Sequence, residues 1–381
     1  MSTTFKIGKI FGIEIGVHWS WVFIFALITW SVAESVLTEF FPEWSSSQRW
    51  VVGVVVAIIF FASILLHELS HSLVAKAKGI PVNGITLFVF GGVSNLGREA
   101  QTAGEEFQIA IVGPLTSLAI GVAFAIAWAA LRGAAPEVSA IAGYLALING
   151  AIAAFNMLPG FPLDGGRVFR SIVWARTNDL LRATRIASRV GVGIAYGMIA
   201  VGLVSVFFFG LFGGLWYVLI GLFLKAASEG SYATLRVESA LKDVHVAAVM
   251  RPAPEPVHAA LALQRLIDER LLATAERAFL IERDGAIAGL ITATDIAKVP
   301  RERWAGTRVE EAMVPAEQVV TVTPDTGLVE AMRLIQQHDV DQLPVIDDGR
   351  IVGMLTRGDV MRHIELRTVF RDTGKKPDER A

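Results

Sequence analysis

The sequence predicts a polytopic α-helical membrane domain followed by a soluble α/β module. Three observations support this fold class: long apolar runs fill the first part of the chain, they stop near Ala227, and an internal repeat fills the rest. The chain of 381 residues is 53% hydrophobic and 18% charged, whereas a soluble domain carries about 25% charged residues. Its mean hydropathy of +0.53 excludes a disordered chain and argues against a purely soluble protein.

Charge and cysteine content narrow the classes of function. The chain has 34 basic and 36 acidic residues and a net charge of −2, so nothing marks a nucleic-acid binder and we expect no nucleic-acid partner. It contains no cysteine, which excludes disulfides and thiolate metal sites. Any transition metal must therefore be held by histidine and carboxylate side chains.

Six apolar segments approach the roughly 20 residues that cross about 30 Å of hydrocarbon. We expect these spans at Val17–Ala33, Val51–Ala75, Ile109–Leu131, Ala140–Leu158, Val190–Phe209 and Leu211–Ala226. Only a few glycines separate the last two, so one long kinked segment is the alternative there. No small-residue cleavage site follows the first span, and we expect no cleavable signal peptide.

The segment between the second and third spans has a different character. Residues 80–98 include the run ITLFVFGGVSNL, whose strand-forming residues flank Gly91 and Gly92. We interpret it as a β-hairpin or a re-entrant loop. Because non-helical backbone at membrane depth must lie against protein or a water-filled cavity, we expect it at a membrane face beside the second span.

The basic residues predict the orientation of the spans. If the N-terminus is cytosolic, twelve lysines and arginines of the membrane domain lie inside, and only Arg49 and Arg132 lie outside. This asymmetry follows the positive-inside rule. We therefore expect a multi-pass protein of the cell membrane, with its N-terminus and its soluble module in the cytosol.

The soluble part contains an internal repeat. The run GLITATDI at residues 289–296 recurs as GMLTRGDV at 353–360, and Met250 and Pro252 recur 63 residues later. Repetition at a fixed spacing indicates two copies of one structural unit. We divide the chain into a membrane domain, a linker, two repeats and a disordered polar tail, at 1–227, 228–240, 241–300, 308–366 and 367–381.

The motif HELSH at residues 67–71 ends a long run without ionisable groups. On a helix, residues i and i+4 share a face, so His67 and His71 can bind one Zn²⁺. Glu68 would lie beside the metal, where it can take a proton from a metal-bound water. A chance pattern is the alternative, but two histidines and a glutamate in an apolar span are costly unless they function.

A catalytic zinc site needs a third protein ligand and one open position. Asp164 is the first aspartate of the chain and follows the fourth span, which returns to the depth of His67. Pro159 and Pro162 break the helix just before it. We favour Asp164 as the third ligand over an ordinary turn at the helix exit. We expect His18 to be an interfacial residue rather than a ligand.

These two motifs resemble those of the site-2 protease family of intramembrane zinc metalloproteases. The run NMLPGFPLDGG at residues 156–166 matches the family pattern Asn-x-x-Pro-x-x-Pro-Leu-Asp-Gly, and the resemblance covers about the first 225 residues. It implies a zinc ion held by His67, His71 and Asp164, with Glu68 as catalytic base. It also implies that peptide bonds are hydrolysed inside or at the edge of the lipid bilayer.

The same resemblance extends to the substrate. It implies that Asn156 positions the substrate backbone and that residues 80–96 form the membrane-associated hairpin of the family, with Gly91 and Gly92 near the site. The implied substrates are single-span membrane proteins, such as membrane-bound anti-sigma factors or signal-peptide remnants.

The repeated module resembles a pair of CBS domains. Both copies carry Gly, two apolar residues, Thr, two further residues and Asp, at 289–295 and 353–359. Such pairs often bind adenosyl ligands of the AMP or ATP type, and they often associate, which favours a homodimer. The resemblance implies contacts to ribose and phosphate from Thr292, Asp295, Thr356 and Asp359. The alternative is that these residues only cap the helix that follows.

We therefore expect an intramembrane zinc metalloprotease that is regulated by adenine nucleotide at its CBS pair. The rival hypothesis is a CBS-regulated metal-ion transporter or channel. A transport site needs no non-ligating base next to its first histidine, and a permeation path needs polar groups along its length. Glu68 and the otherwise apolar spans thus favour the protease. A structural protein with a vestigial zinc site is a third alternative, which the complete set of four residues opposes.

Overall fold

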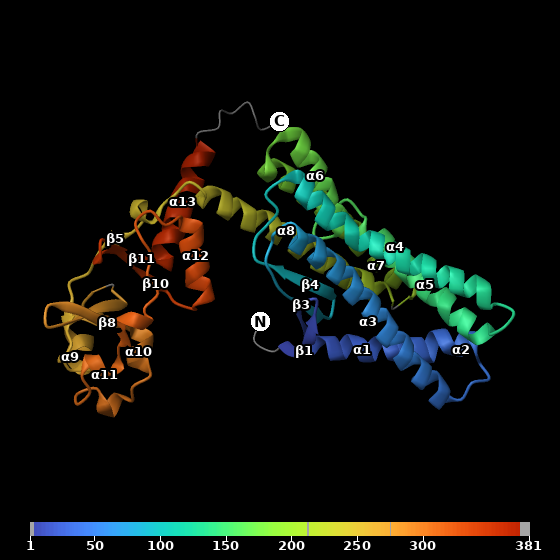
Figure 1. Cartoon of the computed structure of the whole chain (residues 1–381), viewed down its shortest axis with the longest axis horizontal. Coiled ribbons are helices and arrows are strands. Elements are labelled where there is room, and N and C mark those ends of the chain that lie inside the picture. Colours follow the sequence, from blue (N-terminus) through green and yellow to red (C-terminus); the bar gives the residue numbers. More distant parts are fainter. Residues whose placement is uncertain (1–3, 212, 275, 374–381) are drawn as a thin grey trace. The chain divides into compact units, whose positions relative to one another are not determined.

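A computed structural model describes residues 4–211, 213–274 and 276–373 of the chain. The chain forms two compact units that meet after Thr234, and each unit has its own core (Figure 1). The first unit contains the apolar helices and one β-sheet, and the second contains the internal repeat. This division matches the predicted combination of a helical membrane domain and an α/β module.

Long helices make up most of the first unit. Their bounds are α1 (Trp19–Ser31), α2 (Leu37–Phe40), α3 (Ser46–Ala77), α4 (Ala103–Leu131), α5 (Pro136–Asn156), α6 (Asp164–Thr177), α7 (Leu180–Phe209) and α8 (Gly214–Leu241). Five described helical segments are long and apolar enough to cross a membrane: Trp19–Phe40, α3, α4, α5 and α7. They overlap the first five expected spans.

The last two expected spans correspond to two helices. α7 ends at Phe209, where Gly210 adopts a left-handed conformation, so a single kinked helix does not form. α8 is apolar in its first half and then carries Lys225 and Glu229, and it does not meet the criteria that the other five segments meet. A sixth span therefore stays a prediction.

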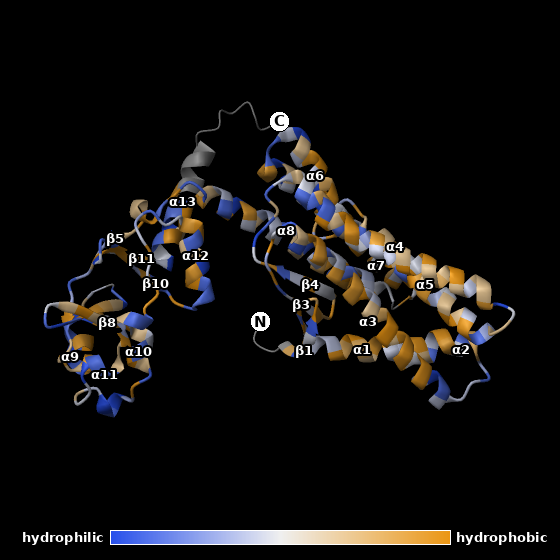
Figure 2. Ribbon diagram, viewed as in Figure 1, coloured by the Kyte–Doolittle hydropathy of each residue, from blue (hydrophilic) through white to orange (hydrophobic). Residues whose placement is uncertain are grey.

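Apolar residues predominate along the long helices (Figure 2), and many of their large side chains are exposed. Val51 and Ile126 are 65% exposed, and Phe207 is 78% exposed. Large apolar surfaces of this kind are rare on soluble monomers. They are what a lipid-facing helix surface requires, because lipid tails solvate apolar side chains.

A four-stranded sheet lies beside α3. Its strands are β1 (Thr4–Ile10), β2 (Ile13–His18), β3 (Val82–Phe88) and β4 (Gly91–Leu96), in the order β1-β2-β3-β4. β3 and β4 pair antiparallel as a hairpin within the predicted segment, and β2 joins them in parallel through Ile15 and Val17.

The prediction that the first span starts at Val17 was wrong. Val17 ends the buried face of β2, on which Ile13 and Ile15 also lie, and the first helix begins at Trp19 with His18 as its N-cap. Alternating apolar residues form a strand here because Ile13 and Ile15 pack against α3 through Leu69.

The second unit consists of two small sheets and short helices. Its elements are β5 (Arg251–Pro252), β6 (Val257–His258), α9 (Leu263–Leu266), β7 (Ala278–Arg283), β8 (Ala286–Thr292), α10 (Ala293–Ala297), α11 (Val309–Ala312), β9 (Val314–Pro315), α12 (Leu328–Gln337), β10 (Gln342–Asp347), β11 (Arg350–Thr356) and α13 (Arg357–Thr373). Each copy of the repeat supplies one antiparallel hairpin, β7–β8 or β10–β11. Between the two hairpins lies an apolar cluster that includes Leu280, Leu290 and Met354.

The two copies exchange their edge strands. β5, from the start of the first copy, pairs with β11 of the second, and β9, from the start of the second copy, pairs with β8 of the first. Leu241 and Val244 accordingly pack in the core of the second copy. The expected boundaries 241–300 and 308–366 therefore separate the copies in sequence but not in space.

The division between the two units falls inside the expected linker, but two expected segments differ in structure from the prediction. The expected linker at 228–240 is helical, because α8 runs through it to Leu241 with a Lys225–Glu229 ion pair one turn apart. A single glycine at 230 lowers helix stability without ending the helix. The expected disordered tail begins as helix, since α13 continues to Thr373 and no Gly or Pro occurs between 359 and 373. Residues 374–381 lie outside the described residues.

A candidate metal centre in the membrane unit

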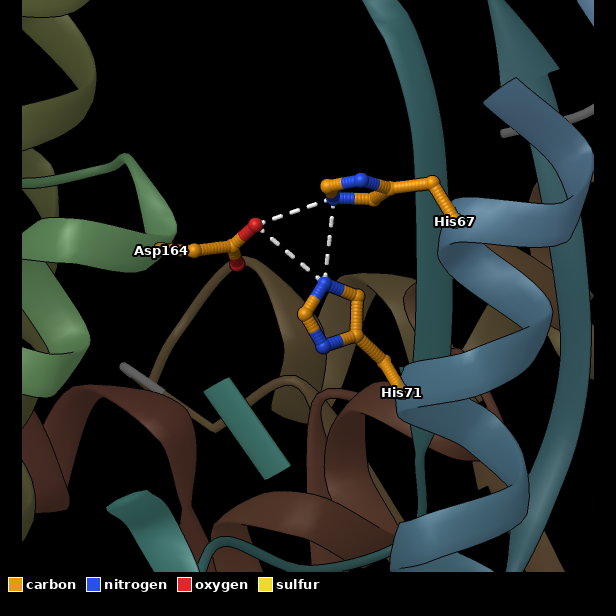
Figure 3. Close-up of side chains that lie close together, drawn as sticks. All are labelled: His67, His71 and Asp164. Atoms are coloured by element: carbon orange, nitrogen blue, oxygen red, sulfur yellow. Dashed lines mark hydrogen bonds and ion pairs between the residues drawn. The ribbon is translucent and has the colours of Figure 1, made fainter. Parts of the chain in front are cut away.

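Three side chains from two helices converge at one point. His67 and His71 lie one turn apart on α3, and Asp164 is the first residue of α6 (Figure 3). The Nε2 atoms of the two histidines are 3.2 Å apart, and Oδ2 of Asp164 lies 3.0 Å from one and 3.2 Å from the other. Both histidines are buried. Among the described residues this is the group that could hold a metal ion.

The spacing of these donors fits a tetrahedral zinc site. Zinc–nitrogen and zinc–carboxylate bonds of 2.0–2.1 Å place two ligand atoms about 3.3 Å apart in a tetrahedron. The three observed separations of 3.0–3.2 Å come close to this value. Two imidazoles and one carboxylate also leave one of four positions open, which is typical of catalytic rather than structural zinc sites.

The outer nitrogens of both histidines are engaged by α4. Nδ1 of His71 donates to the backbone carbonyl of Ile109, and Nδ1 of His67 lies 2.9 Å from the hydroxyl of Ser117. A hydrogen bond from Nδ1 fixes the ring and leaves the lone pair of Nε2 free for a metal. These contacts therefore orient both imidazoles toward Asp164.

A stripe on α4 provides these contacts and the space for an ion. Ile109, Gly113 and Ser117 are spaced by four residues, so they share one helix face, and all three are buried. A Cβ atom at Gly113 would lie less than 3 Å from Nε2 of both histidines. Gly113 therefore leaves open the volume in which an ion would lie. None of these three residues belongs to a motif that predicted a functional role.

Glu68 lies next to the metal ligands but outside their cluster. Its side chain packs against Gly92 of β4, where an added Cβ would lie 3.0 Å from the carboxyl carbon of Glu68. The hydroxyl of Ser72, one turn further along α3, forms a 2.6 Å hydrogen bond with Ser94 of the same strand. The hairpin is thus fixed against the segment of α3 that carries Glu68.

A buried ion pair holds the helix that carries Asp164. Nε of Arg170 on α6 donates to the carboxylate of Glu106 on α4 at 2.6 Å, and Glu106 is fully buried. A buried carboxylate requires a partner, and here α6 supplies it.

The other predicted residues of this unit lie at helix ends. Asn156 is the last residue of α5, and Pro159 and Pro162 fall in the connection to α6, as the motif predicted. The imidazole of His18 caps α1 and lies 2.8 Å from Ser20, so it takes no part in the metal cluster.

The four CBS residues form two equivalent local pairs. The hydroxyl of Thr292 donates to Asp295 at 2.7 Å, and the backbone N–H of Asp295 donates back to that hydroxyl. Thr356 and Asp359 repeat the arrangement at 2.6 Å. Each pair caps the helix that follows its strand, as the capping alternative predicted. The remaining carboxylate oxygens meet Lys298 and Arg251, respectively.

The apolar helices and the His–His–Asp cluster together point to the class of membrane proteins with a catalytic metal centre. Comparison with known proteins makes this specific. The family model of Peptidase family M50 matches residues 55–138 and 129–198, and that of the CBS domain matches residues 309–366.

Relatives with the same organisation extend over both units. A protein of Synechocystis sp. named as a zinc metalloprotease is 34% identical over 96% of each chain. A protein of Mycobacterium tuberculosis with a similar name, Rip3, is 35% identical over 96% of this chain and 94% of its own. The solved site-2 protease from Methanocaldococcus jannaschii is 28% identical, covers 60% of this chain and 94% of its own, and gives a TM-score of 0.43.

The chain therefore belongs to Peptidase family M50, the site-2 protease family of zinc metalloproteases, and carries a CBS module. Family membership favours a protease over the metal-ion transporter that the CBS repeat had left open. It also agrees with a multi-pass membrane protein, as the five apolar helical segments indicate.

Proposed function

We propose that this chain hydrolyses peptide bonds of membrane-spanning proteins, with zinc held by His67, His71 and Asp164 and with Glu68 as general base. The observation that carries the proposal is the convergence of the three donor atoms within 3.2 Å of one another. Side chains 93 and 97 residues apart in sequence have no structural need to meet in this way.

Each residue of the site has a distinct role in this proposal. A zinc ion at the cluster would supply Lewis acidity for the substrate carbonyl and for the attacking water. Glu68 accepts the proton of that water and then returns it to the leaving amine. Gly92 leaves room for the carboxylate to take up this position, and Ser117 and the carbonyl of Ile109 keep both imidazoles aligned.

The substrate must reach this site as an extended chain. In a spanning helix, the peptide carbonyls are hydrogen-bonded and shielded from attack. β4 is an edge strand beside Glu68 and pairs only with β3 among the described strands, so it offers backbone groups to an added strand. Asn156, at the end of α5, would contribute a side-chain amide to the backbone of the same substrate segment.

The proposal includes an arrangement of the chain in the membrane. We propose six spans, with the first half of α8 as the sixth, and a hairpin β3–β4 that lies at the membrane face. The positive-inside asymmetry supports a cytosolic N-terminus and a cytosolic CBS module. Single-span membrane proteins, such as anti-sigma factors or signal-peptide remnants, are then the substrates that fit.

The CBS module is the proposed regulator of the enzyme. We propose that it binds a ligand of the AMP or ATP type through Thr292, Asp295, Thr356 and Asp359, and that two chains associate through these modules. Two equivalent Thr–Asp pairs at helix starts support a twofold site. A ligand regulates only if its affinity differs between two states of the enzyme.

The test is cleavage of a co-expressed single-span reporter by wild type, Glu68→Gln and the matched control Glu39→Gln, which changes an exposed glutamate on α2. We expect a shortened product with wild type and the control, and none with Glu68→Gln, whose zinc content stays normal. Full cleavage by Glu68→Gln contradicts the base assignment. Asp164→Ala should lose zinc as well as activity.

Regulation is tested on the full chain in nanodiscs. Binding of AMP and of ATP is measured by calorimetry for wild type and for Asp295→Asn with Asp359→Asn, and subunit mass is measured with and without nucleotide. Binding that survives the double substitution contradicts the assigned residues. A mass that corresponds to one chain under all conditions contradicts the dimer.

A further inference from the structure

A second polar site lies in the membrane unit, on residues that the metal centre does not use. A pocket of about 360 Å³ opens between α7 and α8. Its lining residues are Arg185, Ser188, Arg189, Val192, Glu229 and Tyr232. The four residues of α7 are spaced i, i+3, i+4 and i+7, so they share one helix face, and the two of α8 are one turn apart.

The pocket carries excess positive charge. Glu229 is neutralised by Lys225, whose Nζ lies 2.9 Å from its carboxylate. Arg185 is held in place by Tyr232, because its Nε donates to the phenol oxygen at 2.9 Å. Arg189 is exposed and has no ion pair within the described part of the chain. Because Glu229 is paired with Lys225, neither guanidinium group has an ion-pair partner among the described residues.

A buried hydroxyl in the same wall also lacks a partner. Ser188 is only 5% exposed, and its Oγ has no hydrogen-bond partner among the described residues. A buried polar atom without a hydrogen-bond partner destabilises the fold. Ser188 lies between Arg185 and Arg189 in sequence and lines the pocket with them, and its hydroxyl would donate a hydrogen bond to an anion bound against this wall.

We propose that this pocket binds a phosphate group, carried either by a phospholipid headgroup or by a soluble phosphate ester. Two guanidinium groups and a hydroxyl match the several acceptor oxygens of a phosphate, and arginine binds such groups in a bidentate manner. The pocket also has a suitable depth. The charged start of α7 gives way to an apolar run at Val190, which is the level of lipid headgroups, where basic pockets between spanning helices bind phospholipids.

Occupation of the pocket would reach the metal centre through the backbone. Ser228, next to Glu229 on α8, donates to the carbonyl of Phe161, and the N–H of Phe161 donates to the carbonyl of Ala187 on α7. Phe161 lies three residues before Asp164. A phosphate held on α7 beside Arg185, whose Nε donates to Tyr232 of α8, would therefore stabilise the two helices that hold the segment presenting Asp164.

The experiment uses the full zinc-loaded chain and has two arms. In the first, the chain is held in nanodiscs of phosphatidylcholine with phosphatidylglycerol, and the lipids retained by the protein are counted by native mass spectrometry. In the second, the chain is held in maltoside detergent micelles, which contain no phosphate, and binding of inorganic pyrophosphate is measured by calorimetry. The variants are Arg189→Gln, Ser188→Ala and Arg182→Gln, the last as a control on an exposed arginine of α7 outside the pocket.

We expect Arg189→Gln to weaken binding about tenfold and Arg182→Gln to leave it unchanged, because only the former removes a charge-assisted contact. Ser188→Ala should weaken it less. If Arg189→Gln weakens binding only in the first arm, the ligand is a lipid headgroup. If it weakens binding of pyrophosphate in the second arm, the site accepts a soluble phosphate. Equal losses in the two arginine variants, or no binding in either arm, would overturn the proposal. Normal zinc content in each variant shows that it has folded.

Discussion

The metal centre and the Thr–Asp pairs of the CBS module both place an aspartate at a helix start, but the partners of the aspartates differ. Asp164 meets histidines that are 93 and 97 residues away in sequence. Asp295 and Asp359 bind threonines three residues away, which also cap their helices. A carboxylate satisfied by its own turn needs no ligand to explain it. Asp164 and the two histidines place three potential metal-ligand atoms at one point, and a metal ion would explain that convergence.

The comparison shows which polar groups point to function. Groups that converge from distant elements and leave one coordination position open indicate chemistry. Groups that complete a helix cap are explained by local structure. A ligand that binds such groups must compete with the cap for the same hydrogen bonds. Asp359 lies between these cases, because Arg251, 108 residues away, also binds it.

The largest effect should follow from filling the space beside the metal ligands. In Gly113→Ala, the added methyl group would lie less than 3 Å from both Nε2 atoms. We expect zinc content and reporter cleavage to be lost together. Zinc content is measured by metal analysis of the purified chain, and cleavage is measured with the co-expressed reporter. Gly104→Ala on the same helix is the control, because nothing lies within 4 Å of its Cβ. Normal zinc content in Gly113→Ala would break the assignment of the ion to this position.

The buried ion pair should give the next largest effect. Arg170→Gln leaves the carboxylate of Glu106 buried without its main partner, which costs about 3–5 kcal/mol in comparable cases. Arg167, 3.9 Å from the same oxygen and partly exposed, is the matched control. We expect Arg170→Gln to lower the thermal unfolding temperature and to weaken zinc retention, and Arg167→Gln to do neither strongly. If both variants lowered the unfolding temperature and zinc retention equally, the positive charge near Glu106, and not the Arg170–Glu106 pair, would hold α6.

Sequence patterns predicted the features that depend on local spacing. The apolar runs predicted the five long apolar helical segments, and the four-residue spacing in HELSH put His67 and His71 on one face. Proline positions before Asp164 predicted the break between α5 and α6. The position of Asp164 opposite the histidines followed from chain length, since the fourth span returns to the same depth.

Features that depend on which elements pack together could not be predicted in this way. The stripe of Ile109, Gly113 and Ser117 gains its meaning only because α4 packs on α3, although its small residues at four-residue spacing are typical of close helix contacts. The exchange of β5 and β9 between the repeats is a matter of topology. The alternation of Ile13, Ile15 and Val17 did carry a strand signal, but the apolar run that follows obscured it.

A smaller effect should separate the two Thr–Asp pairs. Thr292→Ala and Thr356→Ala each remove a helix cap, which costs about 1 kcal/mol. Both aspartates keep the backbone N–H of the substituted residue. Asp359 also keeps Arg251 on β5, which is distant in sequence, whereas the remaining described side-chain partner of Asp295 is Lys298, three residues away. We therefore expect faster hydrogen exchange at the start of α10 in the first variant than at the start of α13 in the second. Equal hydrogen exchange at the starts of α10 and α13 in the two variants would contradict a stabilising role of Arg251 at the second pair.

The smallest effect should be a pH dependence at Asp295. Burial raises the pKa of this carboxyl, but hydrogen bonds from Lys298 and Thr292 outweigh it and leave the pKa below its ordinary value. The charged form therefore stabilises the fold above the unfolded pKa of about 3.9, and this contribution is lost as the pH falls through the lower folded value. We expect exchange at the start of α10, corrected for its intrinsic rate, to rise only below about pH 4 in wild type. In Asp295→Asn it should be faster at neutral pH and should not change in this window, because the titrating group is gone. A rise of the same size in both proteins would assign the dependence to another group and leave the cap of α10 without an electrostatic component.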